Sequence, residues 1–177
     1  ATKKTNEIMA YSYSNIYKLP CTGLRFFTVY GPWGRPDMSL FKFTKAILGS
    51  KKIELYNKGN HIRDFTYIDD VIDGIKKLIK KPPKGQIPYS IFNIGSSNPK
   101  HLKFFLKTNE KVIGKKTSIK LMTLQKGDIY KTHANIGKLF RYTKFKPKVN
   151  ITKGIKNFIS WYGKFYTKWK SLLLKFL

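Results

Sequence analysis

Residues 25–38 read RFFTVYGPWGRPDM, a run of strand-forming residues that opens directly into a loop rich in glycine and proline. The apolar and β-branched residues of Thr22 to Val29 predict a short buried strand. Tyr30 to Pro36 holds two glycines and two prolines in seven residues, which predicts a loop. Leu40 to Leu48 then has the pattern of a helix, and Gly49 is a candidate left-handed residue after its end. The stretch therefore predicts a unit of strand, loop and helix.

Helices and strands alternate along the rest of the chain. Thr2 to Tyr17 carries apolar residues at spacings of about four, which predicts an amphipathic helix that Pro20 ends. Asp69 is a candidate N-cap for a helix over Val71 to Lys80, with Asp73 in its first turn. The other predicted elements are strands at 53–56, 64–68, 90–94 and 118–122, a turn at 57–60, and helices at 101–113, 135–142 and from 151 to about 169. This alternation indicates an α/β fold.

The chain is strongly basic. Its 177 residues include 36 Lys and Arg against 9 Asp and Glu, a net charge of +27, and only four of the basic residues are arginine. This charge favours contact with polyanions, whether nucleic acid, an anionic membrane or a phosphorylated substrate. The lysines are scattered through every segment, however, a distribution that compositional drift in an AT-rich genome also produces. Because they form no basic cluster with interleaved aromatic residues, we do not expect a specific nucleic-acid surface.

Other features narrow the class of protein. Cys21 is the only cysteine, so an intrachain disulfide and a cysteine-based metal site are both excluded, no metal is expected, and a reducing cytoplasm fits. No apolar run approaches the roughly 18 residues of a membrane span, and the polar start ATKKTNE is no signal peptide. The first residue is Ala rather than Met, so we expect an upstream part to be missing. No G-x-G-x-x-G follows a strand, and Gly95 to Pro99 lacks the spacing and lysine of a P-loop.

Several segments, in order along nearly the whole chain, resemble the extended short-chain dehydrogenase/reductase family, and within it the UDP-glucuronate 4-epimerases. They are ATKKTNEIMAYSYSNIY, LPCTGLRFFTVYGPWGRPDMSLFKFTKAIL, IRDFTYIDDVIDGI, FNIGSS, QKGDIYKTHANI and FISWYGKFY. The loop GPWGRPDM is the most specific of these. The resemblance implies the C-terminal part of an NAD(P)-binding Rossmann-type fold with its smaller substrate-binding lobe. Residues 1–36 would end the Rossmann part, 37–177 would form mainly the substrate lobe, and the N-terminal NAD-binding half would be absent.

The resemblance also implies a reaction, the epimerisation of a nucleotide sugar at C4 through a 4-keto intermediate with NAD as cofactor. Lys3 matches the lysine of a catalytic Tyr-x-x-x-Lys pair whose tyrosine would sit two residues before Ala1. Its ammonium would lower the tyrosine pKa and hydrogen-bond the nicotinamide ribose. The backbone of Val29 would contact the NAD carboxamide. The alternative for Lys3 is a solvated lysine at the start of a helix.

Four further residues match positions that hold the substrate in this family. Thr28 and Arg35 would grip the sugar carboxylate, because a guanidinium presents a planar fork to a carboxylate. Arg63 would pair with the pyrophosphate, and Asp128 would accept hydrogen bonds from the ribose. The alternatives are ion pairs of Arg35 with Asp37 and of Arg63 with Asp64, and an ordinary turn residue for Asp128. The region Ser39 to Phe43 would pack against the uracil.

The chain departs from the family pattern in places. Thr132 to Asn135 reads THAN where Thr-Tyr-Ala-Asp is usual, and the predicted helix at 101–113 carries lysines where acidic residues are usual. The tail after Tyr166 is expected to prolong the last helix, with contact to a membrane surface as the alternative. The expected partners are a UDP-sugar and a second copy bound through the first helix. A remnant that binds UDP-sugar weakly or not at all, and a basic nucleic-acid binder, remain as other functions.

Overall fold

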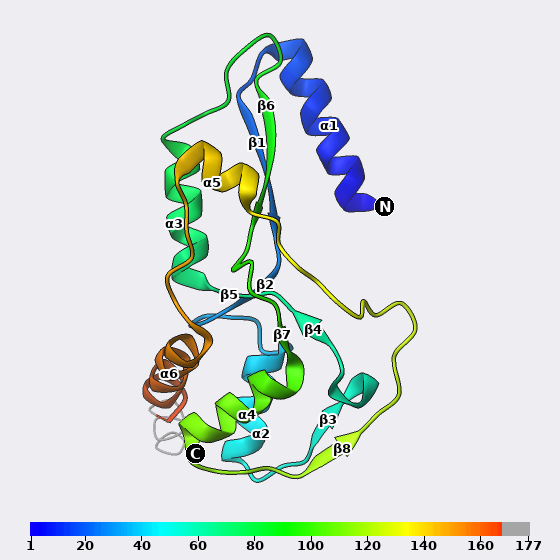
Figure 1. Ribbon diagram of the computed structural model, residues 1–177, viewed down its shortest axis with the longest axis vertical. Coiled ribbons are helices and arrows are strands. Elements are labelled where there is room, and N and C mark those ends of the chain that lie inside the picture. The colour runs from blue at the N-terminus through cyan, green and yellow to red at the C-terminus, as the bar shows by residue number, and fades with distance from the viewer. Residues whose placement is uncertain (168–177) are drawn as a thin grey trace, which may run out of the picture.

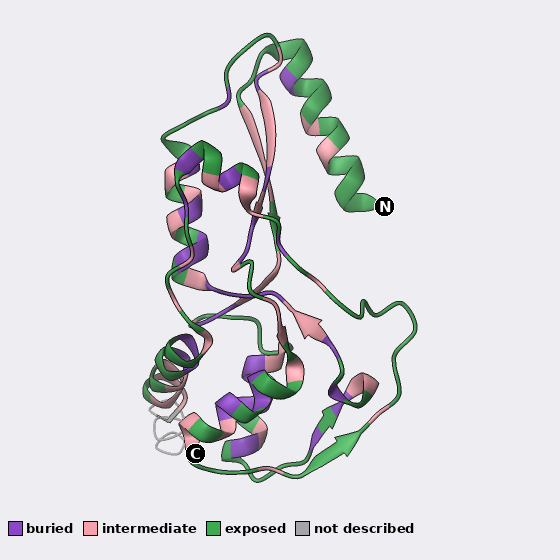
Figure 2. Ribbon diagram, in the orientation of Figure 1, coloured by how far each residue is buried: buried purple, intermediate pink, exposed green. Residues whose placement is uncertain are grey.

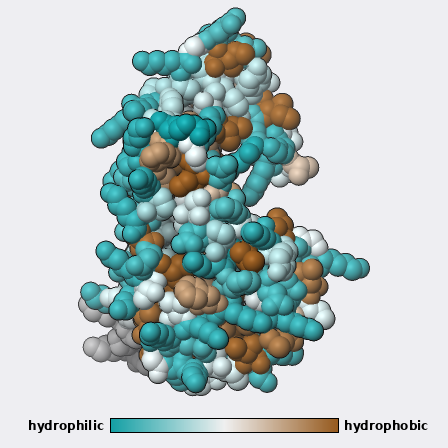
Figure 3. Space-filling model, in the orientation of Figure 1, coloured by the Kyte–Doolittle hydropathy of each residue, from teal (hydrophilic) through white to brown (hydrophobic). Residues whose placement is uncertain are grey.

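The computed structural model describes residues 1–167, which form an upper and a lower part joined by short strands (Figure 1). The α/β class expected from the sequence is confirmed. None of the helices in residues 1–167 has the length and apolar character needed to cross a bilayer. The space-filling view is hollowed between the two parts, on the side where α1 begins (Figures 1 and 3).

The upper part is built on two parallel strands, β1 (Cys21–Phe26) and β6 (Tyr89–Ile94), paired from Cys21 with Tyr89 to Phe26 with Ile94. Helix α1 (Thr2–Tyr17) lies on one side of the strands, and α3 (Ile68–Ile79) and α5 (Gly137–Thr143) lie on the other (Figure 1). A compact core fills the space between the strands and these last two helices; its buried members are Val71, Leu78, Phe92, Ile94, Leu139 and Phe145. The expected boundary at residue 36 therefore does not separate the strands of this sheet, because β6 lies after that boundary and pairs with β1, which lies before it.

The lower part holds the larger core, which is formed mainly by three helices: α2 (Ser39–Leu48), α4 (Leu102–Ile113) and α6 (Ile151–Tyr162), which runs on as a π-helical turn, η2 (Gly163–Thr167). Their buried faces meet one another, as the purple segments of Figure 2 show. The expected apolar face of the last helix is confirmed: Ile155 and Phe158 are buried, and Ile159, Tyr162 and Tyr166 pack against them. Residues 168–177, where most of the predicted helical tail falls, lie outside the described part.

Three pairs of short strands complete the described part of the chain, and the first of these pairs lies where the upper and lower parts meet (Figure 1). β2 (Thr28–Tyr30) pairs in parallel with β5 (Phe65–Tyr67), and β3 (Ile53–Leu55) pairs in parallel with β8 (Ile119–Leu121). β4 (Ile62–Arg63) runs antiparallel to β7 (Lys100–His101), and a short helical turn, η1 (Tyr56–Gly59), precedes β4. The sequence did not predict β4 and β7, because two residues are too few to show a period.

Three local expectations are wrong. The single strand predicted over Thr22 to Val29 is two strands broken at Phe27, because β1 and β2 pair with different partners. The helix expected from Val71 begins at Ile68, so Asp69 lies in its first turn and is no N-cap, and Asp73 lies beyond that turn. Gly49 has a φ of −85°, and the left-handed residue after α2 is Ser50, with a φ of 53°.

Candidate functional site

Thr28 and Val29 of β2 come together with Arg35 of the loop that follows this strand. With Ser39 at the start of α2 and Phe158 of α6, they line a small cavity of about 20 Å³. A cavity of this size has room for about one water molecule. In this form the cavity is too small to hold a sugar.

Arg35 is bound within its own loop. Its Nε donates to one carboxylate oxygen of Asp37 at 3.0 Å and its Nη2 donates to the other. The two side chains are 76% and 56% exposed. The hydrogen bonds from Arg35 lower the pKa of the Asp37 carboxyl, and Asp37 in turn raises the pKa of the guanidinium. The alternative pairing considered from the sequence is thus present, and the guanidinium must exchange or share Asp37 to hold a substrate carboxylate.

The amide of Val29 is also engaged. Its N–H donates to the carbonyl of Phe27 at 3.0 Å, and the N–H of Thr28 donates to the carbonyl of Asp64 at 3.1 Å. These bonds fix the turn of the chain at Phe27. The contact of Val29 with the carboxamide of NAD stays a prediction.

Lys3 lies apart from this cavity, exposed in the first turn of α1. It lines a wider recess of about 610 Å³ between α1 and the strands of the upper part, with Gly23 and Tyr89 among its walls. Residues 1–167 offer the Lys3 ammonium no described partner, so it is free to donate to a group in this recess. The structure does not bring it into one pocket with Thr28 and Arg35.

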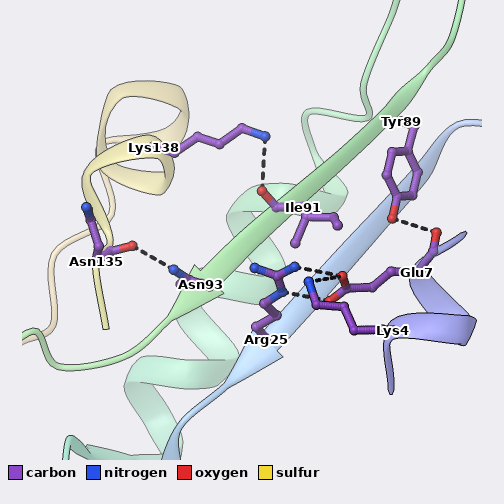
Figure 4. A network of polar contacts seen from close by, with 8 residues as sticks. All are labelled: Lys4, Glu7, Arg25, Tyr89, Ile91, Asn93, Asn135 and Lys138. Carbon is purple, nitrogen blue, oxygen red and sulfur yellow. Dashed lines mark hydrogen bonds and ion pairs between the residues drawn. The ribbon is translucent and has the colours of Figure 1, made fainter. Parts of the chain in front are cut away.

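A polar network fixes α1 against the strands beside Lys3 (Figure 4). Arg25 of β1 donates through Nε and Nη2 to the two carboxylate oxygens of Glu7, both at 2.6 Å. Lys4 adds a contact to the same carboxylate at 3.2 Å, and the hydroxyl of Tyr89 donates to the Glu7 carbonyl at 2.9 Å. The hydrogen bond from Arg25 lowers the pKa of Glu7 to about 2. Glu7 therefore sets the position of Lys3 four residues away on the same helix.

Arg63 and Asp128, predicted to hold the nucleotide, lie side by side. Nη2 of Arg63 donates to Oδ1 of Asp128 at 2.9 Å, and Nη1 donates to the carbonyls of Ile62 and Tyr130, both at 3.1 Å. The second carboxylate oxygen lies 3.0 Å from Nε2 of His61. The ion pair of Arg63 with Asp64, considered as an alternative, is not among the described contacts.

Asp64 is instead a buried acceptor that sequence reasoning missed. It is 0% exposed, and its carboxylate accepts four hydrogen bonds: from the N–H and hydroxyl of Ser96 at 2.7 and 2.8 Å, the hydroxyl of Thr66 at 3.3 Å and the N–H of Ala134 at 3.0 Å. Gly95 must be glycine here, because a Cβ would lie 2.2 Å from that of Ala134. Asp64 thus joins β5, the end of β6 and the segment that follows Asp128. In the sequence, its burial was indicated only by its apolar neighbours in IRDFTYIDD.

The region Ser39 to Phe43 offers little apolar surface to a base. Leu40, Phe41 and Phe43 are all buried in the lower core. Contact with uracil through this region stays a prediction. Within residues 1–167, no group of three His, Cys, Asp or Glu side chains is placed to hold a metal ion.

Three features define the class of this protein: the arrangement of its strands and helices, the segment RDFTYIDD and the loop at 31–36. Comparison with known protein families identifies that class. Residues 1–95 match the model of the NAD dependent epimerase/dehydratase family, and the chain belongs to that family.

The chain is also similar to several named proteins. The chain is 48% identical to Protein CapI of Staphylococcus aureus, covering 95% of this chain and 54% of that protein. It is 40% identical to a probable UDP-glucuronate 4-epimerase of Rhizobium meliloti, with coverage of 95% and 54%. The crystal structure of UDP-glucuronic acid 4-epimerase from Bacillus cereus in complex with UDP-glucuronic acid and NAD matches with a TM-score of 0.85 and 30% identity, over 93% of this chain and 52% of that one. The chain thus spans about half the length of the relatives it matches.

Proposed function

We propose that the protein containing this chain is a nucleotide-sugar C4 epimerase that converts UDP-glucuronate to UDP-galacturonate with NAD. The observation that carries the proposal is the placement of Thr28 and Arg35 on one cavity formed by β2 and the loop that follows it. The similarity to UDP-glucuronate 4-epimerases supports it. The proposal includes a cytoplasmic enzyme that forms a homodimer through α1.

The role of Arg35 follows from the chemistry of the 4-keto intermediate, which is a β-keto acid. Such acids lose CO₂ when their carboxylate is free to align with the ketone. A guanidinium that holds both carboxylate oxygens prevents this alignment. Because Arg35 already holds Asp37 in the same two-oxygen geometry, the substrate replaces one carboxylate by another.

Lys3 would act in the recess between α1 and β1. When bound, NAD supplies the acceptor for the hydride that leaves C4 and returns to it. A free ammonium suits the hydroxyls of the nicotinamide ribose, and it favours the ionised form of a neighbouring tyrosine. Glu7 and Arg25 hold the helix that presents this ammonium.

Arg63 and Asp128 would bind the nucleotide. An arginine has five N–H donors, and the described contacts of Arg63 use three of them. The remaining two are available to the diphosphate. The Asp128 carboxylate has further lone pairs for ribose hydroxyls.

The test is the conversion of UDP-glucuronate by the protein produced with whatever sequence its gene places before Ala1. We expect UDP-galacturonate as the product, and Arg35→Ala to lower kcat/KM about a hundredfold or more and to release CO₂. Arg141→Ala, which removes an exposed arginine of α5, is the matched control and leaves activity unchanged.

Full activity without CO₂ release in Arg35→Ala would remove this role for Arg35. A folded protein that binds UDP-sugar weakly or not at all and converts none of it would be a non-catalytic remnant. An in-frame stop codon just upstream of Ala1 would favour the same conclusion.

A further inference from the structure

A buried histidine stands behind the Asp128 carboxylate. His61, just before β4, is 4% exposed, and its Nε2 lies 3.0 Å from Oδ2 of Asp128. The other oxygen, Oδ1, accepts from Arg63 at 2.9 Å. Side-chain exposure rises from 5% at His61 through 18% at Arg63 to 33% at Asp128. The partly exposed Asp128 carboxylate therefore has two partners, His61 and Arg63, that are more deeply buried than it is.

The segment that carries Asp128 needs such anchors. Residues 123–130 are exposed and form no helix or strand. The far end of this segment is tied to β4: the N–H of Ile62 donates to Tyr130 and the N–H of Thr132 donates to Ile62, both at 3.0 Å. At its ends, the segment also accepts from the N–H of Asn57 at Thr123 and from Nη1 of Arg63 at Tyr130. Between these ends, the described hydrogen bonds and ion pairs to the rest of residues 1–167 are those of the Asp128 side chain.

Nε2 of His61 is buried but makes no hydrogen bond of ordinary geometry with its near neighbour. A buried polar nitrogen without a bond costs free energy, so a proton on Nε2 favours closer approach of the carboxylate. The ionisable side chains on β7 and in the first turn of α4 are basic: Lys100, His101 and Lys103, whose Nζ donates to Asn60. The acidic residue of α4, Glu110, accepts from the N–H of Thr117 instead. Asp128 is thus the acidic partner available to His61 within residues 1–167.

We propose that His61 is a positioning residue for binding a nucleoside diphosphate. It holds the Asp128 carboxylate, which in turn holds the Arg63 guanidinium, so that both groups are ordered before the nucleotide arrives. Ordering them beforehand lowers the entropic cost of binding. The inference rests on the proposed function of Arg63 and Asp128 at the nucleotide.

The test compares two substitutions of His61, one that keeps an N–H donor and one that removes it. His61→Met fills a similar volume without a donor, whereas His61→Gln places an amide N–H at the reach of Nε2. We expect His61→Met to raise KM for UDP-glucuronate about tenfold with little change in kcat, and His61→Gln to restore KM to within about twofold of the native value. His101→Met, an exposed histidine of the neighbouring strand, is the control and leaves KM unchanged.

A double-mutant cycle locates the effect. If His61 acts through Asp128, adding His61→Met to Asp128→Asn raises KM no further. Equal KM values in His61→Met and His61→Gln, or full additivity with Asp128→Asn, would overturn the proposal. Where His61→Met lowers the melting temperature too far for assay, His61→Asn replaces it, because its amide is one methylene too short to reach the carboxylate.

The failure of this inference is distinct from failure of the proposed function. If Arg63→Ala and Asp128→Asn both raise KM but His61→Met does not, only the positioning role falls. If neither Arg63→Ala nor Asp128→Asn changes KM, the nucleotide does not bind here, and the positioning role falls with the site.

Discussion

Tyr30 shows how tightly single residues are fitted at the end of β2. Its ring is buried and contacts Phe65, Tyr67 and Phe105, and burial raises the pKa of its hydroxyl. The hydroxyl has no hydrogen-bond partner among the described residues, and it lies against Gly154 of α6. Glycine is therefore required at 154 for space rather than for a special backbone conformation.

The substitution Gly154→Ala tests this fit. A Cβ at 154 would lie 2.3 Å from the Tyr30 hydroxyl and 2.8 Å from its ring, so we expect a loss of about 1–3 kcal/mol in the free energy of unfolding despite the better helix propensity of alanine. Gly163→Ala, where a Cβ meets no described atom within 4 Å, is the control. Denaturant melts that rank the two variants as equally stable would contradict the prediction.

At the scale of elements, Asp64 joins segments that lie far apart in sequence. Its carboxylate accepts from Thr66 of β5, from Ser96 after β6 and from Ala134, while its carbonyl accepts from Thr28 of β2. A substitution of Asp64 should therefore alter the structure both at the cavity that Thr28 lines and in the segment after Asp128.

We expect Asp64→Asn to lower the free energy of unfolding by about 2–4 kcal/mol, because an amide NH₂ would face buried N–H donors in place of an acceptor. Thermal melts measure the loss. Asp69→Asn, an exposed position on the next helix, is the matched control and changes stability little. A stable Asp64→Asn variant would show that the carboxylate is dispensable.

The link between α1 and β1 responds to acid. Folding lowers the pKa of Glu7 from 4.5 to about 2, so its contribution to stability is fully present above pH 4.5 and is lost as the pH falls through about 2. We expect the melting temperatures of the native protein and of Glu7→Gln to differ above pH 4.5 and to converge toward pH 2. A difference that does not depend on pH would show that the contact matters for packing rather than for charge.

The sequence predicted long elements well and contacts between distant residues poorly. The bounds of α1 matched as predicted, because its apolar spacing and Pro20 define both periodicity and end. The break at Phe27 could not be seen, because it arises from strand partners that are distant in the chain. Thr28 pairs with Phe65, 37 positions away, and Phe26 pairs with Ile94, 68 positions away. The bond between Arg63 and Asp128 spans 65 positions and was hidden for the same reason.

At the scale of the whole molecule, α1 leaves a large apolar face uncovered. Its exposed side chains include Ile8, Met9, Tyr13, Ile16 and Tyr17, each more than half exposed. Figure 3 shows hydrophobic side chains among hydrophilic ones over the upper part, where Figure 1 places this helix. In the proposed enzyme, a Rossmann sheet and a second copy of the chain would cover this face.

We expect residues 1–177 produced alone to be poorly soluble and to self-associate despite the charge of +27, because exposed apolar patches of this kind drive association. Size-exclusion chromatography measures it, and Ile8→Glu combined with Ile16→Glu should shift the protein toward monomer. A sharp, cooperative melt of a monomeric native chain would contradict the expectation.

Phe27 marks a place in the chain where insertions and deletions should be poorly tolerated. β1 and β2 are separated by this one residue, yet they belong to different strand pairs. Because successive strand residues face opposite sides, inserting or deleting one residue here would turn Thr28 to the other face of β2. Residues 33–36 of the neighbouring loop are exposed and have no strand register to preserve. Insertions after Trp33 should therefore leave the fold intact while displacing Arg35, whereas insertions between Phe26 and Thr28 should disturb the strand pairing itself.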